Sequence, residues 1–441
     1  MRNNSDTIAA LATSNGEGGI AIIRVSGKDA LSILKRLFRP TSKKHAFEHR
    51  YMMYGNAVDE SGSPIDEVMA VYFSAPNTYT REDVCEIHTH GGLISGKVLE
   101  RVIALGARPA ERGEFTYRAF VNGRIDLSGA EAVMDLISAK SAQAARASLR
   151  QMKGGVSSRI GVCREKLMDL VSLIDAAADY PEEIDEEVTS ASVREGAKEI
   201  YAALVSCADE RYARIMNKGA SVVIAGVPNV GKSSVMNALL SSDRSIVTDI
   251  PGTTRDTVSE LVSIGGVNLT LTDTAGIRET GDIIEKIGVD RAQSSIEEAD
   301  CVILVLDASR PITEEEQKLI NKMDERFIAV ANKTDIKNED FGFCLKISAK
   351  QGIGIGELQE KIYSMVSPGE DDEKLLSLRH VQCAKKAIEC LKRVLDAPEG
   401  TYLDLFREDL TEALMILGEI TGENISENVI DSIFERFCVG K

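Results

Sequence analysis

The chain of 441 residues contains 43% hydrophobic and 27% charged residues and carries a formal net charge of −17. Its length predicts two or three domains, and the lack of a long apolar run or a signal peptide predicts a cytoplasmic protein without a membrane span. The negative charge argues against a broad nucleic-acid-binding surface, so an RNA-directed activity would need a local basic patch or a basic partner.

The first 120 residues mix short β-like runs with glycine turns. Residues 20–25 and 67–75 have the composition and alternation that predict strands, and residues 30–37 have apolar positions at helical spacing. This mixture predicts an α+β domain at the N-terminal end of the sequence.

Helical periodicity replaces this pattern from about residue 128. Apolar residues recur at helical spacing up to residue 149 and again over residues 160–178. Residues 180–187 break the pattern, and residues 192–217 are expected to be helical again. This part of the chain is therefore predicted to be all-α.

Strand and helix signals alternate through residues 221–366. Apolar runs typical of buried parallel strands occupy residues 221–225, 269–272, 302–306 and 327–331. Residues 367–373 have the composition of a linker, and helices are predicted over 375–395 and 402–417. Because helical segments flank the α/β segment, we expect the α/β domain to be an insertion in a helical domain.

The cysteines are scattered, without a Cys-x-x-Cys pair. This predicts neither a zinc site nor a disulfide framework, and reduced, buried thiols are expected for all but one of them. Cys383 and Cys390 are seven residues apart on a predicted helix and should lie in its core. The cysteines are Cys85, Cys163, Cys207, Cys301, Cys344, Cys383, Cys390 and Cys438.

Residues 226–233, Gly-Val-Pro-Asn-Val-Gly-Lys-Ser, fit the phosphate-loop pattern between a predicted strand and a predicted helix. Glycines allow backbone N–H groups to surround phosphates, and the following helix N-terminus favours negative charge. Lys232 is expected to reach the β- and γ-phosphates, and the Ser233 hydroxyl to bind Mg²⁺. These roles predict a nucleotide triphosphatase.

Three further motifs follow in the order that a GTPase requires. Residues 273–276, Asp-Thr-Ala-Gly, end a strand, and residues 252–256 suit a switch loop with Thr254 on Mg²⁺. Asp335 of 332–335 can accept hydrogen bonds from guanine N1–H and the 2-amino group, which adenine lacks. The Ala349 N–H of 348–350 can face guanine O6. Chance matches would need four coincidences, so the α/β segment is predicted to be a Ras-like GTPase domain.

The predicted nucleotide-binding residues come from all of these motifs. They are Asn229, Val230, Gly231, Lys232, Ser233, Ser234, Thr248, Thr253, Thr254, Asp273, Thr274, Ala275, Gly276, Asn332, Lys333, Asp335, Ser348, Ala349 and Lys350.

Ile277 stands where many small GTPases have the glutamine that orients the attacking water. An isoleucine cannot do this, so another residue must position the water and another cation must offset the developing charge. Glu279, Asp282 and Glu285 are the nearby acidic candidates, and their spacing alone does not choose among them.

Several motifs outside the GTPase segment are specific when taken together. They occupy residues 6–9, 18–27, 79–86, 90–92, 107–110, 113–116, 118–123, 126–132 and 438–441. With the GTPase motifs, they show that the chain resembles the MnmE (TrmE) family of tRNA-modification GTPases over its whole length.

The resemblance implies a homodimer formed through an N-terminal folate-binding domain. It also implies a complex with the FAD-containing protein MnmG, expected as a heterotetramer, that adds a 5-carboxymethylaminomethyl-type group to the wobble uridine of tRNA. A reduced folate would supply one carbon, and potassium would promote dimerisation of the GTPase domains. The implied domains are 1–120 (folate binding and dimerisation), 121–217 (helical, first part), 218–367 (GTPase) and 374–441 (helical, second part).

The resemblance also assigns the residues that Ile277 leaves open. Asn229, Thr248, the Ile250 carbonyl and Thr253 match the family's potassium ligands, and K⁺ can stand where an arginine finger would. Glu285 matches the water-orienting glutamate, so Glu285 and Lys232 are the expected catalytic residues.

Folate contacts are implied for Arg24, Glu86, Arg124 and Lys441. A glutamate can bind the pterin edge through two hydrogen bonds, and cations suit the glutamate carboxylates of the ligand. Two positions depart from the family pattern. Arg81 stands where the family usually has glycine, and Arg124 often appears as lysine.

Two features of the sequence keep alternative interpretations. Cys438 is either a small buried hydrophobic residue that anchors the tail or a thiol with a role in one-carbon chemistry. His88 and His90 alternate along a predicted strand, where packing or polar contacts are favoured over a metal site.

Two other functions compete with tRNA modification. A ribosome-assembly GTPase that binds rRNA without modifying it would share the nucleotide motifs, but it would be expected to carry a basic RNA-binding module. A membrane-associated GTPase would be expected to carry a basic amphipathic helix. Neither feature is evident, so tRNA modification is the favoured function.

Overall fold

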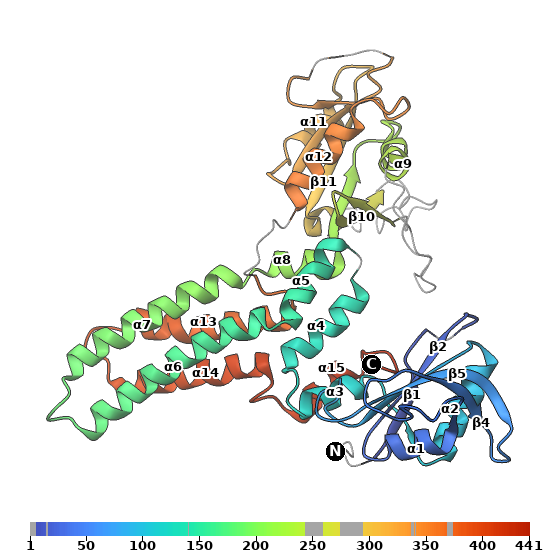
Figure 1. Cartoon of the computed structure of the whole chain (residues 1–441). Coiled ribbons are helices and arrows are strands. Elements are labelled where there is room, and N and C mark those ends of the chain that lie inside the picture. The colour runs from blue at the N-terminus through green and yellow to red at the C-terminus, as the bar shows by residue number, and fades with distance from the viewer. Residues whose placement is uncertain are drawn as a thin grey trace, which may run out of the picture. The chain divides into compact units, whose positions relative to one another are not determined.

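The computed structural model in Figure 1 describes residues 6–14, 16–139, 141–242, 259–273, 294–336, 339, 341–367 and 374–441. Its contacts separate two compact units. Unit 1 comprises Met1–Met134, Leu149–Ile200 and Lys386–Lys441, and unit 2 comprises Asp135–Ser148 and Tyr201–Lys385. Unit 2 thus interrupts unit 1 in the sequence, as expected for an inserted α/β domain. The predicted domain boundaries themselves stay predictions.

Within the described residues, the strands of unit 1 form one seven-stranded sheet in the order β3-β4-β5-β6-β2-β1-β7. Neighbouring strands are antiparallel, except that β1 and β7 are parallel. The strands are β1 (Ile8–Leu11), β2 (Ala21–Ser26), β3 (Phe38–Pro40), β4 (Met53–Val58), β5 (Pro64–Phe73), β6 (Val84–Thr89) and β7 (Arg108–Pro109).

Helices α1 (Ala30–Leu37) and α2 (Leu93–Ala104) cover one face of this sheet (Figure 1). Helix α1 buries Ala30, Ile33, Leu34 and Leu37, whose spacing places them on one side of the helix. Side chains alternate between the faces of a strand, so the residues between the buried apolar ones point to the opposite face. That opposite face carries the polar site described below.

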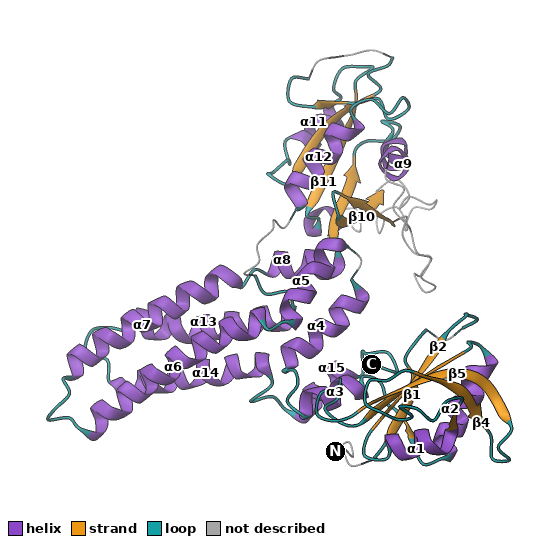
Figure 2. Ribbon diagram, viewed as in Figure 1, coloured by secondary structure: helices purple, strands orange, loops and turns teal. Residues whose placement is uncertain are grey.

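After β7 the chain forms the other described helices of unit 1, some of which continue into unit 2. They are α3 (Glu114–Val121), α4 (Leu127–Ser138), α5 (Ala142–Met152), α6 (Gly155–Asp179), α7 (Glu186–Cys207), α13 (Leu378–Asp396), α14 (Leu403–Thr421) and α15 (Glu427–Phe434). Helices α6 and α14 pack side by side (Figure 2). No helix in the described part of the chain combines the length and the apolar character needed to cross a membrane.

The sheet of unit 2 has six strands among the described residues, in the order β13-β12-β11-β8-β10-β9. All pairs are parallel except β9 with β10. The elements are α8 (Glu210–Lys218), β8 (Ala220–Ala225), α9 (Lys232–Ser242), β9 (Ser259–Ile264), β10 (Val267–Asp273), β11 (Cys301–Asp307), α11 (Glu314–Ile320), β12 (Phe327–Asn332), β13 (Leu345–Lys346) and α12 (Ile355–Val366). The predicted fold class, with its α+β, all-α and mostly parallel α/β parts, is confirmed.

The stretch predicted to be helical over 192–217 is divided between two helices in the structure, α7 and α8. Helix α7 ends at Cys207, and Asp209 is the N-cap of α8, where its side chain accepts a hydrogen bond from the Tyr212 N–H at 2.9 Å. An aspartate at this position satisfies an unpaired N–H of the new helix and favours a fresh start. Apolar periodicity alone did not reveal the break.

A fully buried arginine, Arg118 of α3, connects its own helix with the segment before β1 and the loop before β6. Its guanidinium contacts Asp6 at 2.6 Å, Glu82 at 3.2 Å and Glu114 at 3.1 Å. Arg108 adds bonds to Asp6 at 2.8 Å and Glu114 at 2.6 Å. The cluster therefore joins the segment before β1, the loop before β6 and helix α3.

Two carboxylates of this cluster, Asp6 and Glu114, have pKa values lowered by their partners. The hydrogen bond from Arg108 is the main cause that lowers the pKa of Asp6. Burial works to raise the pKa of Glu114, but hydrogen bonds from Arg108, the Glu111 N–H and Arg118 lower it overall. Because folding lowers both values, their contribution to stability is complete above the unfolded pKa values, near 4, and is lost as the pH falls through the folded values.

Replacing Arg118 by methionine should destabilise unit 1 by about 3 kcal/mol or more, because a buried carboxylate cluster loses its central cation. Hydrogen exchange measured by mass spectrometry should become faster in residues 6–11 and 114–121. Adding Glu114→Gln to Arg118→Met should restore part of the protection. Lys166→Met removes an exposed ion pair with Glu199 and serves as the control, with little change expected. Equal exchange in the Arg118 and Lys166 variants would contradict the structural role of the cluster.

Candidate functional site

The carboxyl edge of the unit 2 sheet gathers the polar residues of the nucleotide motifs. Strands β8, β10, β11 and β12 run parallel, so their carboxyl ends meet at one edge. Gly226 follows β8, and Asp273, Asp307 and Asn332 are the last residues of the other three strands. Ligands of open α/β sheets bind at this edge, and the phosphate loop lies there.

The backbone of the phosphate loop depends on its glycines. Gly231 has φ 98°, and a Cβ atom there would lie 2.4 Å from Nδ2 of Asn332. At Gly226 the corresponding atom would lie 2.5 Å from the Val305 carbonyl oxygen. Asn229 has φ 65°, a conformation that asparagine adopts more readily than most residues. Close packing against β11 and β12 thus fixes the curve of the loop.

Lys232 and Ser233 open helix α9 and face the groups expected for phosphate and Mg²⁺ binding. The Lys232 ammonium donates to the carbonyls of Gly226 and Val227, both at 3.0 Å, so its charge lies over the loop. The Ser233 hydroxyl donates to Asp273 at 2.7 Å. A hydroxyl beside a carboxylate is an oxygen set that fits Mg²⁺, which keeps several waters and binds few protein ligands.

The base-recognition loops are joined by a buried asparagine. Asn332 donates to the Val230 carbonyl at 3.0 Å and accepts from the Ala349 N–H at 3.1 Å. The Ser348 hydroxyl donates to Asp335 at 2.7 Å, which orients the carboxylate predicted to read guanine. The Ala349 N–H predicted for guanine O6 is bonded to Asn332 in this structure, so the base would have to share it.

Sequence reasoning missed one member of this site, Asp307. Its carboxylate accepts from the Lys333 ammonium at 2.6 Å, and the same ammonium donates to the Asn229 carbonyl at 2.7 Å. Burial works to raise the pKa of Asp307, but Lys333 and Ser309 lower it overall. Asp307 therefore positions Lys333 across the phosphate loop. An aspartate that ends an apolar strand was the available signal.

The structure brings the phosphate-loop residues, Asp273 and the two base-recognition loops together, with Ser234 in α9 and Lys350 exposed beside Ala349. The other predicted residues of this site lie outside the described residues. They are Thr248, Ile250, Thr253, Thr254, Thr274, Ala275, Gly276 and Glu285, together with Ile277, Glu279 and Asp282.

A second polar site lies on the N-terminal sheet of unit 1. Arg24 of β2 and Glu86 of β6 are direct cross-strand partners, and the guanidinium donates to one carboxylate oxygen at 2.8 and 3.0 Å. Their neighbours Ile23 and Ile87 are fully buried under α1 and α2. The pair therefore occupies the opposite face, where the Arg24 guanidinium lies 5.8 Å from the rings of Tyr79 and Phe115.

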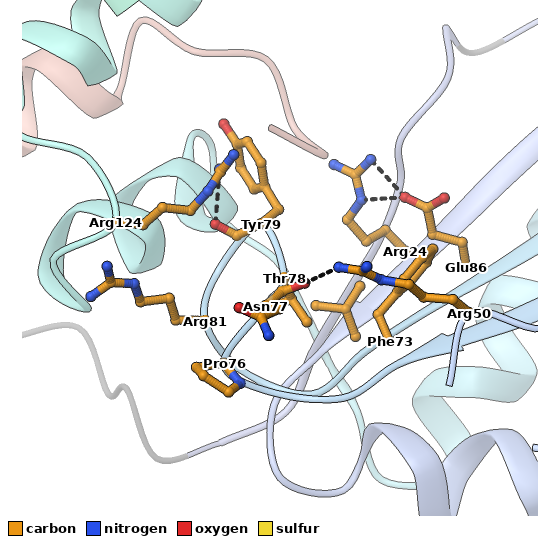
Figure 3. A pocket seen from close by; sticks show the side chains of 11 residues that line it. Arg24, Arg50, Phe73, Pro76, Asn77, Thr78, Tyr79, Arg81, Glu86 and Arg124 are labelled. Atoms are coloured by element: carbon orange, nitrogen blue, oxygen red, sulfur yellow. Dashed lines mark hydrogen bonds and ion pairs between the residues drawn. The ribbon is translucent and has the colours of Figure 1, made fainter. Parts of the chain in front are cut away.

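Arg24, Glu86 and Arg124 line one cavity of about 530 Å³ (Figure 3). Arg124 donates to the Tyr79 carbonyl at 3.1 Å, and its guanidinium lies 4.6 Å from the centre of the Tyr79 ring. The volume suits a ligand of drug size. The lining also includes residues that sequence reasoning did not assign to a site, namely Arg50, Phe73, Pro76, Asn77, Thr78, Tyr79, Arg81 and Val84.

The predicted contact Lys441 lies in a tail that passes close to Arg24. The Gly440 carbonyl is 3.5 Å from Nη1 of Arg24, and the Phe115 N–H donates to the Lys441 carbonyl at 3.2 Å. A Cβ atom on Gly440 would lie 2.2 Å from the Leu11 carbonyl oxygen, so only glycine permits this approach. Lys441 is not among the residues that line the cavity, although its chain segment runs beside it.

Cys438 in this tail is exposed, which contradicts one of its two interpretations, that of a small buried anchor, while a role in one-carbon chemistry stays a prediction. The neighbouring Phe437 is buried instead and packs against Phe434. Cys344 is partly buried and the other six cysteines are buried. Burial raises the pKa of Cys344 and Cys390 to about 11, so these thiols are protonated and unreactive at neutral pH.

His88 lies in β6 and His90 directly follows that strand. His90 has a hydrogen-bonded carboxylate partner, whereas the buried Nε2 of His88 has no hydrogen bond among the described residues. His90 bonds Asp66 at 2.7 Å, and His88 lies 3.9 Å from Glu86. In the described part of the chain, no group of three or more histidine, cysteine, aspartate or glutamate side chains is placed to hold a metal ion.

Comparisons with known proteins agree on the family. Residues 127–438 match the model of the MnmE helical domain, and residues 7–124 match that of the GTP-binding protein TrmE N-terminus. The tRNA modification GTPase MnmE of Finegoldia magna is 42% identical over 99% of this chain and 100% of that protein. The proteins of the same name from Clostridioides difficile and a Thermoanaerobacter species are each 43% identical, covering 99% of both chains.

These matches extend over the cavity, the helices and the phosphate-loop site alike. The chain belongs to the MnmE (TrmE) family of tRNA modification GTPases.

Proposed function

We propose that this chain hydrolyses GTP as one subunit of a cytoplasmic complex that adds a 5-carboxymethylaminomethyl-type group to the wobble uridine of tRNA. The observation that carries this proposal is the presence, in one chain of this family, of a guanine-nucleotide site and an arginine-lined cavity with a single glutamate. The first supports GTP as the substrate, and the second supports a reduced folate as the one-carbon source.

For the hydrolysis step, the chain supplies a positioned cation and a set of oxygens. Lys232 would exchange its loop carbonyls for phosphate oxygens, and Ser233 with Thr254 would hold Mg²⁺, with Asp273 bound through water. When bound, Mg²⁺ would neutralise part of the negative charge of the phosphates. Asp335 selects guanine through the donor pair N1–H and 2-NH₂.

We assign the water-orienting role to Glu285 and potassium binding to Asn229, Thr248, the Ile250 carbonyl and Thr253. The Asn229 side chain is exposed and has no hydrogen bond to another described residue, so it is available to an ion. Potassium supplies positive charge near the leaving phosphate, the role of an arginine finger in other GTPases. Because the family resemblance implies that potassium promotes dimerisation of the GTPase domains, potassium binding would couple hydrolysis to that dimerisation.

For the folate, we assign the pterin edge to Glu86 and the glutamate end to cationic side chains, including Arg24, Arg124 and Lys441. Glu86 uses one carboxylate oxygen for Arg24, which leaves the other oxygen for the ligand. The exposed Cys438 belongs to the tail whose Gly440 carbonyl lies 3.5 Å from Nη1 of Arg24, and it is a candidate for the one-carbon step. Homodimerisation through the N-terminal domain and a heterotetramer with the FAD-containing MnmG complete the proposed assembly, which would help a chain of charge −17 to hold tRNA.

Exchange of K⁺ for Na⁺ should lower GTP turnover by at least about a hundredfold, because the site would lose a charge equivalent to an arginine finger. Nucleotide affinity should change little. Turnover and binding of a fluorescent GTP analogue are measured at equal ionic strength in the two salts. Equal turnover in both salts would remove the potassium assignment.

Glu285→Ala, in the same assay, should retain nucleotide binding and K⁺-dependent association but lose hydrolysis, by roughly 10²- to 10⁴-fold. Glu279→Ala is the matched control and should hydrolyse GTP at nearly the normal rate. The reverse pattern would assign the water-orienting role to Glu279.

Calorimetry of the full chain with 5-formyltetrahydrofolate should detect one site per chain. Glu86→Gln should weaken it by roughly ten- to a hundredfold, because the pterin edge loses a charged acceptor. Glu67→Gln changes an exposed carboxylate of β5 and should bind normally. The absence of any binding heat with the unmodified chain would refute the folate proposal.

Nucleosides from the tRNA of cells that lack this chain should contain wobble uridine without the carboxymethylaminomethyl-type group, as measured by mass spectrometry. The unmodified chain should restore the group, and the Glu285→Ala chain should not. Intact modification together with a defect in ribosomal subunits would instead favour the ribosome-assembly alternative.

A further inference from the structure

The cavity of unit 1 has an excess of positive charge. Four arginines line it, but Glu86 is the one carboxylate among its described lining residues, and Glu86 pairs with Arg24. The other three arginines donate to backbone carbonyls, Arg50 to Asn77 at 3.3 Å, Arg81 to Asn122 at 2.9 Å and Arg124 to Tyr79 at 3.1 Å. Each therefore keeps most of its N–H groups for a ligand.

The arginines are distributed unevenly around the cavity. Arg81 and Arg124 come from the two segments that meet at residues 122–124, and Arg81 Nη1 lies 3.5 Å from where a Cβ atom of Gly123 would be. Figure 3 shows these two side chains on one side of Tyr79 and the Arg24–Glu86 pair on the other. The cavity thus has a glutamate end and a cationic end.

Arg81 is held in a conformation that does not suit its side chain. Its φ is 59°, in the left-handed region that glycine adopts at the lowest energetic cost. A long side chain at such a position, on the wall of a cavity, indicates that the side chain itself has a use there. Glycine would fit the backbone better and would remove the charge.

We propose that Arg81 and Arg124 form an anion subsite that makes the cavity select folates with several γ-linked glutamates over the monoglutamate. This inference rests on the proposed folate site. With the pterin at Glu86, the glutamate end of the ligand points to the cationic end, and each added γ-glutamate brings one more carboxylate. A guanidinium binds a carboxylate through two parallel hydrogen bonds, so Arg81 suits the additional carboxylates once Arg124 has bound the first.

The same arginines could bind RNA phosphates, which are also anions. Their placement favours the small ligand, because they line a cavity of about 530 Å³, a volume typical of small-molecule sites. The subsite is therefore assigned to the folate chain, and tRNA binding becomes an outcome of the test.

Calorimetry of the full chain compares the mono- and pentaglutamate forms of 5-formyltetrahydrofolate. The pentaglutamate should bind roughly tenfold more tightly, as expected for one or two additional charged contacts that are partly open to water, and 0.5 M salt should reduce this ratio. In Arg81→Gly, pentaglutamate affinity should fall by about the same factor and monoglutamate affinity by far less.

Two control variants separate the subsite from general effects. His45→Gly relieves a positive φ of 59° at an exposed residue outside the cavity lining, and Lys97→Gln removes an exposed charge of α2. Both should keep the tenfold ratio. Arg81→Lys should keep part of it, because a point charge remains without the planar fork.

The outcomes are distinguishable. If the monoglutamate binds and the pentaglutamate binds no more tightly, the subsite is refuted while the folate proposal stands. If neither form binds, both proposals fall. If Arg81→Gly weakens tRNA binding in a filter assay but leaves the ratio unchanged, the arginine serves RNA and the subsite is refuted.

Discussion

Burial of the Arg118 guanidinium is the constraint on which the arrangement of unit 1 depends. The side chain has no solvent exposure and contacts carboxylates from the segment before β1, the loop before β6 and helix α3. Glu82 of that loop also accepts from the Ser26 hydroxyl at 2.7 Å, which ties the loop to β2. An unpaired charge at such depth would be very costly, so the three segments are stable only together.

The Arg118 cluster is linked to the cavity because Glu82, one of its members, directly follows the cavity residue Arg81 in the sequence. In addition, the Thr80 hydroxyl is 2.6 Å from that of Ser26 in β2. These contacts hold the loop that carries Tyr79 and Arg81 against the sheet. Arg118 is a structural residue, because it does not line the cavity. It lets exposed arginines keep defined positions, and defined positions are what ligand selectivity requires.

The sequence contained enough information to predict the nucleotide site in some detail. The glycines, Lys232 and the base-recognition loops follow from chemistry that tolerates few alternatives, and their order along the chain made chance negligible. The helix predicted over 30–37 is observed at those residues as α1, because a short amphipathic stripe is a local property. Asp307 was missed because its role depends on where the Lys333 side chain lies.

The cationic wall of the cavity was also hard to predict, because it too depends on where side chains from distant segments lie in the fold. Arg50 and Arg81 belong to loops, and no periodicity connects them with Arg24 and Glu86, which share a strand pair. The sequence showed Arg81 as a departure from a glycine, and the structure supplies its physical meaning, a φ of 59°. The break between α7 and α8 at the N-cap Asp209 was not predicted, because the helical spacing of apolar residues continues across it.

The tail shows how backbone contacts can leave side chains available for chemistry. The carbonyls of Cys438 and Lys441 accept from the N–H groups of Gly113 and Phe115, and Val439 forms a bridge with Arg112. Gly440 supplies the close approach to β1, and the buried ring of Phe437 supplies the hydrophobic anchor. Since anchoring uses main-chain atoms and Phe437, the Cys438 thiol and the Lys441 ammonium are not needed to hold the tail. A segment built in this way can present reactive or charged groups beside Arg24 without a loss of its own stability.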